Sequence, residues 1–198
     1  MKYFSYKYFL LCFILISGCD LFSTRSPEIP DTGRTKYQPP TSASIVISNF
    51  INSIIEKNSE NYISCFSDTA QNNREYLFTP SSEAASQYPE LFSYWDRSKE
   101  LRAFNFMLAA IKEDNIPDIT LTNDGWEILL PDSAVFYSDY LLTVPHDLQS
   151  TPNVFSGKLQ FTLLPNNNQW SIIKWIDISV DSDTIKPSWS VLKASFSN

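Results

Sequence analysis

The chain has 198 residues, with 15 basic and 22 acidic side chains and a formal net charge of −7 at pH 7. An acidic surface is repelled by phosphate backbones and anionic lipid, which argues against nucleic acid as a partner and against a basic membrane-binding patch. Only four glycines occur. They are too few for a glycine-rich phosphate cradle or a dinucleotide fingerprint, and we expect no cofactor.

Residues 1–18 have the pattern of a signal peptide. Lys2 and Lys7 precede an apolar run at residues 8–16. That run is too short to span a bilayer, which takes ~20 apolar residues, but suits a signal-peptide core of ~7–15. The following Ile16-Ser17-Gly18-Cys19 resembles the lipobox of bacterial lipoproteins. The resemblance implies cleavage before Cys19 and acylation of this cysteine; an ordinary signal peptide with an accidental cysteine is the alternative.

Acylation of Cys19 would place the protein in the cell envelope, at either the inner or the outer membrane. Each buried methylene contributes ~0.8 kcal/mol, so two or three acyl chains anchor a protein stably. Residues 20–40 contain four prolines and no hydrophobic period, which is typical of a flexible tether. The predicted organisation is therefore a signal peptide at 1–18, a lipidated cysteine and tether at 19–40, and a single domain at 41–198.

Helices are predicted in the first half of this domain. Apolar residues between Ile47 and Ile55 have helical spacing, and Thr41 or Ser42 is the expected N-cap. A short second helix begins at Ser59, and "REYLFTP" reads as a strand that ends at Pro80. After a long loop, a third helix is expected to bury one stripe of side chains: Leu101, Phe104, Leu108 and Ile111.

Strands are predicted after Pro117, where β-branched and aromatic runs alternate with turn residues. The runs are "DITLTND", "WEILLP", "AVFYSDYLLTV", "GKLQFTLLP" and "QWSIIKWIDISV". Asn166–Asn168 is the expected hairpin turn between the last two, since asparagine tolerates positive φ. Early helices followed by antiparallel strands predict an α+β domain with its helices on one face of a curved sheet.

This order of elements resembles the nuclear transport factor 2-like superfamily. Local matches are the first helix after a capping Thr41, then "NYISCFSD", "LFSYWDRSKEL", "NNNQWSIIKWID" and "SWSVLKASF"; they are also similar to bacterial envelope lipoproteins of that superfamily. The resemblance implies a sheet that wraps into a cone around the helices. Members similar to ketosteroid isomerase or polyketide cyclases use an Asp, Tyr or His in the cone for proton transfer. Others bind ligands there or fill the cone with side chains, so the fold alone does not specify a function.

Asp177 is the candidate catalytic residue. In "WSIIKWIDISV" it shares a strand face with Ile173 and Trp175, so it could point into the cone and act as a general base. The alternatives are a solvated residue near the strand end or a hydrogen-bond partner for a neighbouring loop. Four aromatic residues are expected mainly in the core, and some of them are candidates to line a pocket: Trp95, Trp126, Tyr137 and Trp175.

The remaining reactive residues indicate no further chemistry. His146, the only histidine, is expected on an exposed connection, and Cys65 as a small buried hydrophobe. These two residues lack the further ligands that a zinc site needs. Asp181–Thr184 is expected to be a solvated loop, because a calcium loop needs more ligands and a turn glycine. We predict no metal site.

The resulting hypothesis is a lipid-anchored, non-catalytic envelope domain, attached to the membrane through its acyl chains. It would bind a small apolar ligand or another envelope protein. Two alternatives stay open: a cofactor-free isomerase or dehydratase with Asp177 as base, and a structural spacer whose cone is filled.

Overall fold

The computed structural model describes residues 35–180 and 186–197. The predicted signal peptide, Cys19, residues 20–34 and the loop at Asp181–Thr184 lie outside the described residues. Within the described ranges, none of the helices combines the length and the apolar character needed to cross a bilayer.

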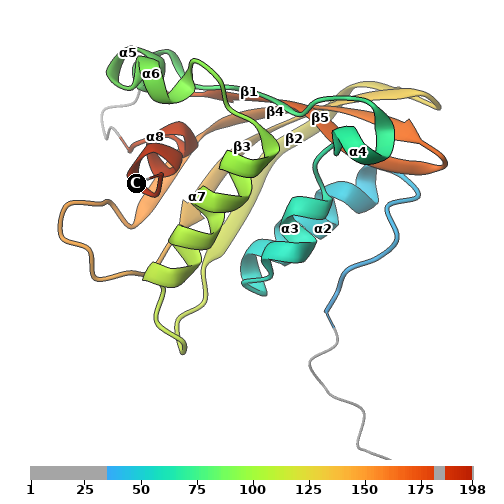
Figure 1. The fold of residues 1–198 in the computed structure, drawn as a ribbon. Helices are drawn as coiled ribbons and strands as arrows, with labels where there is room; N and C mark the ends of the chain where they lie inside the picture. The colour runs from blue at the N-terminus through green and yellow to red at the C-terminus, as the bar shows by residue number, and fades with distance from the viewer. Residues whose placement is uncertain (1–34, 181–185, 198) are drawn as a thin grey trace, which may run out of the picture. The chain divides into compact units, whose positions relative to one another are not determined.

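Five strands form one sheet in the order β1-β5-β4-β3-β2. Their bounds are β1 Leu77–Thr79, β2 Asp118–Leu130, β3 Ser133–Thr143, β4 Val154–Asn166 and β5 Gln169–Ile178. Strand β1 runs parallel to β5, and the other neighbours are antiparallel. Figure 1 shows helices α2, α3, α7 and α8 together on one face of this sheet, which confirms the predicted α+β arrangement.

The turn and the bulges explain how the sheet curves. Asn167 and Asn168 have φ angles of 49° and 64°, as the two central positions of a type I′ hairpin require, so the predicted turn is confirmed. Register shifts interrupt the β2–β3 ladder twice and the β4–β5 ladder once. Such bulges increase strand twist and bend. They also explain why two predicted strands, "DITLTND" and "WEILLP", are one bulged strand.

Helices α2 (Ala43–Ile55), α3 (Ser59–Ser64) and α7 (Arg97–Ala110) begin at side-chain caps. The Ser42 hydroxyl accepts from the Ile45 amide at 3.3 Å, and Asn58 and Asp96 cap the other two, satisfying donors that a helix start leaves free. The loop predicted after β1 contains two short helices, α5 (Ser82–Gln87) and α6 (Pro89–Phe92). Helices α4 (Thr69–Asn72) and α8 (Trp189–Ser195) complete the domain.

The buried face of α7 differs from the predicted stripe. Phe104 and Ile111 are buried as expected, but Leu101 and Leu108 are only half-buried. Three further positions on α7 face inward: Glu100, Ala103 and Met107. One of them, Glu100, is charged. The buried face is shifted toward Glu100 because this side chain points into the domain and is paired there.

The domain begins before the predicted boundary. One compact unit covers Thr35 to Asn198. Gln38 exchanges two hydrogen bonds with the side chain of Asn49 on α2, at 2.9 and 2.7 Å, and the Trp170 amide donates to the Pro40 carbonyl at 2.7 Å. Residues 35–40, which were assigned to the tether, therefore belong to the folded domain.

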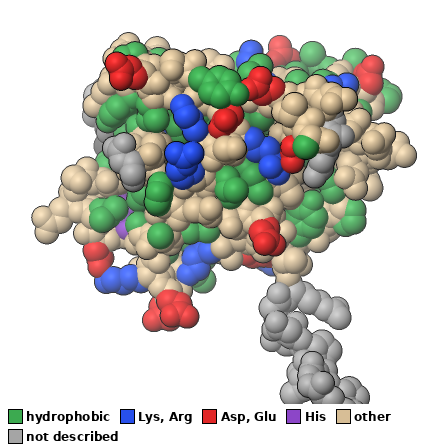
Figure 2. Space-filling view, viewed as in Figure 1, with side chains coloured by type: hydrophobic (Ala, Val, Ile, Leu, Met, Phe, Trp, Pro, Cys, Tyr) green, Lys and Arg blue, Asp and Glu red, His purple; other side chains and the backbone are tan. Residues whose placement is uncertain are grey.

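Aromatic side chains dominate the core between helices and sheet. Trp175 on β5 is fully buried and meets Phe50, Phe161 and Trp189 edge-to-face at centroid distances of 5.7, 5.1 and 4.8 Å. Edge-to-face contacts match the quadrupoles of the rings. On the helical face of the molecule, basic and acidic side chains of the described residues are interspersed, as Figure 2 shows.

Candidate functional site

A buried ion pair lies among these aromatic rings. Glu100 on α7 and Lys193 on α8 approach to 2.6 Å between Oε2 and Nζ, and their side chains are 2% and 3% exposed. Charges are almost never buried this deeply unless they are paired, because removing an ion from water costs several kcal/mol. The pair is therefore a central feature of the domain interior.

The Glu100 carboxylate accepts hydrogen bonds from three further side chains. Tyr62 donates to Oε1 at 2.7 Å, while Tyr76 and Trp95 donate to Oε2 at 3.0 and 2.7 Å. Burial, and next the charge of Glu100, raise the pKa of both phenols well above their usual value. Both tyrosines therefore stay neutral donors across the physiological pH range.

The Lys193 ammonium group also faces aromatic rings. Its Nζ lies 3.5 Å from the ring centroid of Phe78, 3.7 Å from that of Trp175 and 5.5 Å from that of Trp95. Cations are attracted to ring faces within about 6 Å. Burial lowers the pKa of Lys193 to about 8, and the nearby charges of Glu100 and Asp177 oppose part of this shift.

Asp177 lies beside this pair and holds the start of α8. It is buried, as its predicted strand face implied. Its Oδ1 accepts from the Tyr140 hydroxyl at 2.7 Å, and its Oδ2 accepts from the Ser190 amide at 2.7 Å and from the Ser190 hydroxyl. Tyr140 in turn accepts from the Trp189 amide at 2.6 Å. Both carboxylate oxygens are thus engaged in docking α8. Asp177 is a hydrogen-bond partner, as one alternative expected, but for the first turn of a helix and not for a neighbouring loop.

Little empty space remains around the ion pair. The cavity between α7 and α8, bordered by Glu100, Phe104 and Lys193 among others, measures about 10 Å³. That volume holds at most one water molecule. Side chains therefore fill this part of the interior.

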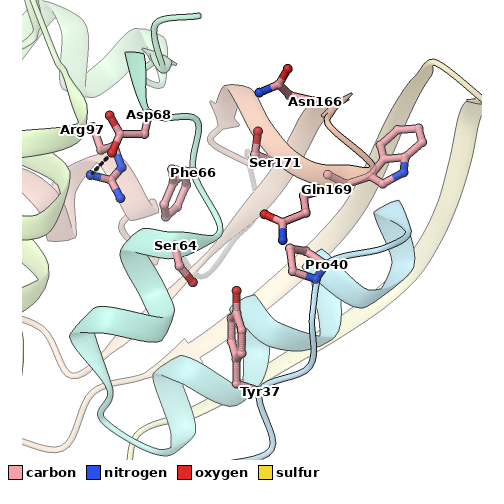
Figure 3. Close-up of a pocket in the computed structure, with 10 residues that line it drawn as sticks. Tyr37, Pro40, Ser64, Phe66, Asp68, Arg97, Asn166, Gln169 and Ser171 are labelled. Carbon is pink, nitrogen blue, oxygen red and sulfur yellow. Dashed lines mark ion pairs between the residues drawn. The ribbon is translucent and has the colours of Figure 1, made fainter. Parts of the chain in front are cut away.

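A larger recess lies at the surface where residues 35–40, the end of α3 and the β4–β5 hairpin meet. This polar pocket has a volume of about 140 Å³. Figure 3 shows Tyr37, Ser64 and Gln169 around it, with Asp68 and Arg97 at one side. Its lining is mostly hydroxyl, amide and charged groups, so it suits a polar ligand rather than an apolar one.

Arg97 forms the charged wall of the polar pocket. Its Nη1 lies 3.3 Å from Oδ2 of Asp68, and its Nη2 donates to the Ile63 carbonyl at 3.2 Å. Its Nε is buried without a hydrogen-bond partner. A buried donor without an acceptor costs free energy.

No known protein-family model matches the sequence, and no curated protein matches it either. Solved structures do. A dehydratase candidate of the nuclear transport factor 2-like family from Streptomyces avermitilis superposes with a TM-score of 0.50 and 12% identity, over 70% of this chain and 94% of that one. The fold is nuclear transport factor 2-like. A candidate scytalone dehydratase from Novosphingobium aromaticivorans gives a TM-score of 0.52 at 9% identity, over 73% of this chain and 89% of the other.

A candidate aromatic ring hydroxylase from the same organism is similar to a comparable extent, with a TM-score of 0.52 and 9% identity over 70% of this chain and 87% of that one. At such identities the likeness establishes the fold and not the chemistry. In this nuclear transport factor 2-like domain, function must therefore be argued from its own side chains.

The predicted pocket aromatics do not share one site in the nuclear transport factor 2-like domain. Trp95 and Trp175 come together at Lys193. Trp126 is half-buried against Phe136 at a centroid distance of 5.0 Å. Tyr137 is 45% exposed on β3, on the opposite side of that strand from its buried residues, because alternate side chains point to opposite faces.

The two other reactive side chains are both buried. For Cys65 this confirms the prediction: it is 3% exposed, and burial raises the pKa of its thiol far above the usual value. For His146 the predicted exposed position is wrong. It is 5% exposed, accepts from the Leu148 amide at Nδ1, and packs against the Phe196 ring. The loop after β3 folds back on α8, which local sequence did not indicate.

Sequence reasoning missed the Glu100–Lys193 pair and the polar pocket. A glutamate or a lysine on an amphipathic helix is normally expected on its solvent-facing side. The pairing of Glu100 with Lys193 depends on tertiary structure alone. A weak signal was present in "LFSYWDRSKEL", where Trp95 and Glu100 occur together. Across residues 35–180 and 186–197, no three His, Cys, Asp or Glu side chains are grouped closely enough to hold a metal ion.

Proposed function

We propose that the chain is a lipid-anchored protein of the cell envelope whose nuclear transport factor 2-like domain is non-catalytic and binds another envelope protein. The binding site is the polar pocket beside residues 35–40, and the interior of the cone is structural. Cys19 carries the anchor, as its resemblance to a lipobox implies.

The main support for binding at the surface is that side chains fill the interior of the domain. Glu100, Lys193 and the surrounding rings take up the centre of the cone, and about 10 Å³ remains between α7 and α8. A small apolar ligand would have to displace a buried ion pair, which costs far more than the burial of its own surface recovers. This observation favours binding at the surface over binding inside.

The same observation weighs against the dehydratase alternative. A general base must reach a substrate proton within about 2.6–3.2 Å, directly or through one water. Both carboxylate oxygens of Asp177 instead accept hydrogen bonds from Tyr140 and Ser190, and these bonds dock α8. Freeing it would require removal of that helix.

The chemistry of the polar pocket suits a polypeptide segment. Tyr37 and Ser64 can donate or accept, and Gln169 offers both an amide and a carbonyl. Backbone and side-chain amides of a partner would satisfy such a mixture. The net charge of the Arg97–Asp68 wall is zero, so the pocket does not select for a strongly charged ligand.

Site-specific photo-crosslinking in intact cells tests this function. A photoreactive residue at Gln169, which is exposed at the pocket, should give one discrete protein adduct in the membrane fraction. Ser64→Tyr fills the pocket from an exposed position and should abolish the adduct. A photoreactive residue at Thr120, exposed on β2, is the matched control and should give none. Equal labelling from Gln169 and Thr120, or an adduct that survives Ser64→Tyr, would overturn the proposal.

A further inference from the structure

The sheet has a second face, opposite the one that carries α2, α3, α7 and α8 in Figure 1. Along β3, every second side chain is buried toward those helices, and the side chains between them point away from the helices. Their ladder partners on β4 and β5 point the same way. We call the outward side chains of β2, β3, β4 and β5 the outer face. Its two central rows cross β3, β4 and β5 and consist of Tyr137, Gln160 and Ile176, and of Asp139, Lys158 and Ile178.

The outer face exposes large apolar side chains. Tyr137, Leu141 and Ile178 are 45%, 40% and 45% exposed. Beside Tyr137 and Ile178 lies a hollow of about 500 Å³, which Asp139 and Lys158 also border. An antiparallel sheet with one solvated face normally alternates apolar residues inward with polar residues outward, and exposed apolar patches mark contact surfaces. The outer face departs from the usual alternation in the manner of a contact surface.

We propose that the outer face binds the outer face of a second copy of this chain, related to the first by a two-fold axis that runs along the strands between β3 and β4. This inference goes beyond the proposed function and does not depend on the role of the polar pocket.

Charge favours a second copy as the partner. The chain carries a formal net charge of −7, so most of its surface repels another copy. The central part of the outer face is balanced instead, with two acidic and two basic side chains: Glu127, Asp139, Lys158 and Lys174. Nζ of Lys158 lies 3.5 Å from Oδ1 of Asp139, and Gln160 donates to Oε2 of Glu127 at 3.2 Å. Contact through this region avoids the repulsion between the two chains.

The two-fold axis also makes these charges complementary. In a two-fold contact the same patch meets itself, and an axis between β3 and β4 places β4 of one copy opposite β3 of the other at the same height along the strands. Asp139 and Lys158 are ladder partners on these two strands, so each Lys158 faces Asp139 of the other copy. Lys174 on β5 shares a row with Ile128 on β2, so it faces the neighbourhood of Glu127 in the other copy.

The outer face has the area that a stable dimer needs. Four strands spaced ~4.8 Å apart, with a residue every ~3.4 Å along the eleven residues of β3, cover roughly 700 Å². A standard interface buries ~800 Å² on each partner. Packed sheets cross at about 30°, so their corners diverge. Thr120, near the end of the β2 edge, is at such a corner and stays outside the contact, so it remains a valid crosslinking control.

Co-isolation of two differently tagged full-length copies from the same cells tests the contact. After solubilisation in mild detergent, the unaltered copies should co-isolate. Lys158→Glu in both copies, or Asp139→Lys in both, should lower co-isolation about tenfold or more, because like charges then face each other across the axis. The two side chains are 56% and 32% exposed, so neither substitution should prevent folding.

The mixed pair is the decisive measurement. A Lys158→Glu copy expressed together with an Asp139→Lys copy again places opposite charges across the axis, and co-isolation should return. Loss of folding in either variant would not give this restoration, and neither would an indirect bridge through a third protein.

A pair of apolar substitutions provides the matched control. Leu141→Lys places a charge on the outer face and should abolish co-isolation. Ile116→Lys changes a residue that is 64% exposed before β2, outside the sheet, and should have no effect. The proposal is overturned if the unaltered copies do not co-isolate, in which case the outer face binds a different molecule or only water. It is equally overturned if the mixed pair is no better than the single variants, or if Leu141→Lys and Ile116→Lys behave alike.

Discussion

Lys193→Met is the substitution that measures the buried ion pair most directly. Methionine has nearly the volume of the lysine stem, so the aromatic contacts largely persist while the charge is lost. Glu100 then keeps its donors but has no cation within the domain interior, where its side chain is 2% exposed. Removing one partner of a buried pair costs ~3–5 kcal/mol, because it leaves the other charge uncompensated.

That loss is large for a domain whose total stability is ~5–15 kcal/mol. For a domain of this size, 1 kcal/mol shifts the thermal midpoint by ~2–4 °C, so Lys193→Met should lower the midpoint by about 6–20 °C. Scanning calorimetry and urea unfolding measure the change. Lys193→Met/Glu100→Gln should recover most of it, because neither charge of the pair remains.

A surface pair serves as the matched control. Lys112 forms an ion pair with Asp147, and their side chains are 66% and 73% exposed, so Lys112→Met should leave the midpoint nearly unchanged. If Lys193→Met behaves like Lys112→Met, or if the double variant is less stable than the single one, Glu100 and Lys193 are not a buried pair and the account of the interior fails.

Three further outcomes are expected. A thiol reagent should label Cys65 slowly in the native state and rapidly in denaturant, because the thiol is buried and its pKa is raised; fast native labelling would contradict this. Cys19→Ser should abolish acyl labelling and release the protein from membrane fractions, whereas continued acylation would refute the anchor. Asp177→Asn places an amide opposite the Ser190 amide donor and should cost ~1–3 kcal/mol in urea unfolding, and an unchanged midpoint would show that Asp177 does not dock α8.

Local features of the fold were predictable because they depend on neighbouring residues. Ser42 caps α2 since its hydroxyl reaches an amide three residues away. Asn167 and Asn168 form the hairpin because asparagine adopts positive φ at little cost. The inward direction of Asp177 follows from the two-residue period of a strand. Each of these features can be argued from a few consecutive side chains.

Features that depend on distant contacts were not predictable in this way. The burial of Glu100 requires Lys193, which lies on another helix more than ninety residues later, and no periodicity in α7 indicates a partner. His146 is buried because the loop after β3 returns to Phe196. Residues 35–40 read as a tether by composition, yet Gln38 finds Asn49 on α2. The polar pocket was missed for the same reason, since Tyr37 forms part of its wall.

The last prediction concerns alkaline pH, where Lys193 and the other buried groups act in opposite directions. The pKa of Lys193 is about 8 in the folded state, below the value of 10.5 for a free lysine. Between these values the unfolded chain binds a proton that the folded chain has lost, so Lys193 makes the free energy of unfolding rise with pH.

The raised pKa of Cys65 has the opposite effect above about pH 9, as do the raised values of Tyr62, Tyr76 and Tyr140 above about pH 10.

A difference measurement separates these contributions. Lys193→Met/Glu100→Gln lacks the ion pair but keeps Cys65, so subtracting its free energy of unfolding from that of the unaltered protein removes the effect of the thiol. Tyr62 and Tyr76 do not cancel in this way, because Glu100 contributes to their raised pKa, but they act only above about pH 10. The difference should rise by about 1 kcal/mol between pH 8 and pH 9, since one pKa unit corresponds to 1.36 kcal/mol. Urea unfolding at half-unit pH steps measures it. A flat or falling difference would mean that burial does not lower the pKa of Lys193, and that its ammonium group is better solvated than its place among the aromatic rings implies.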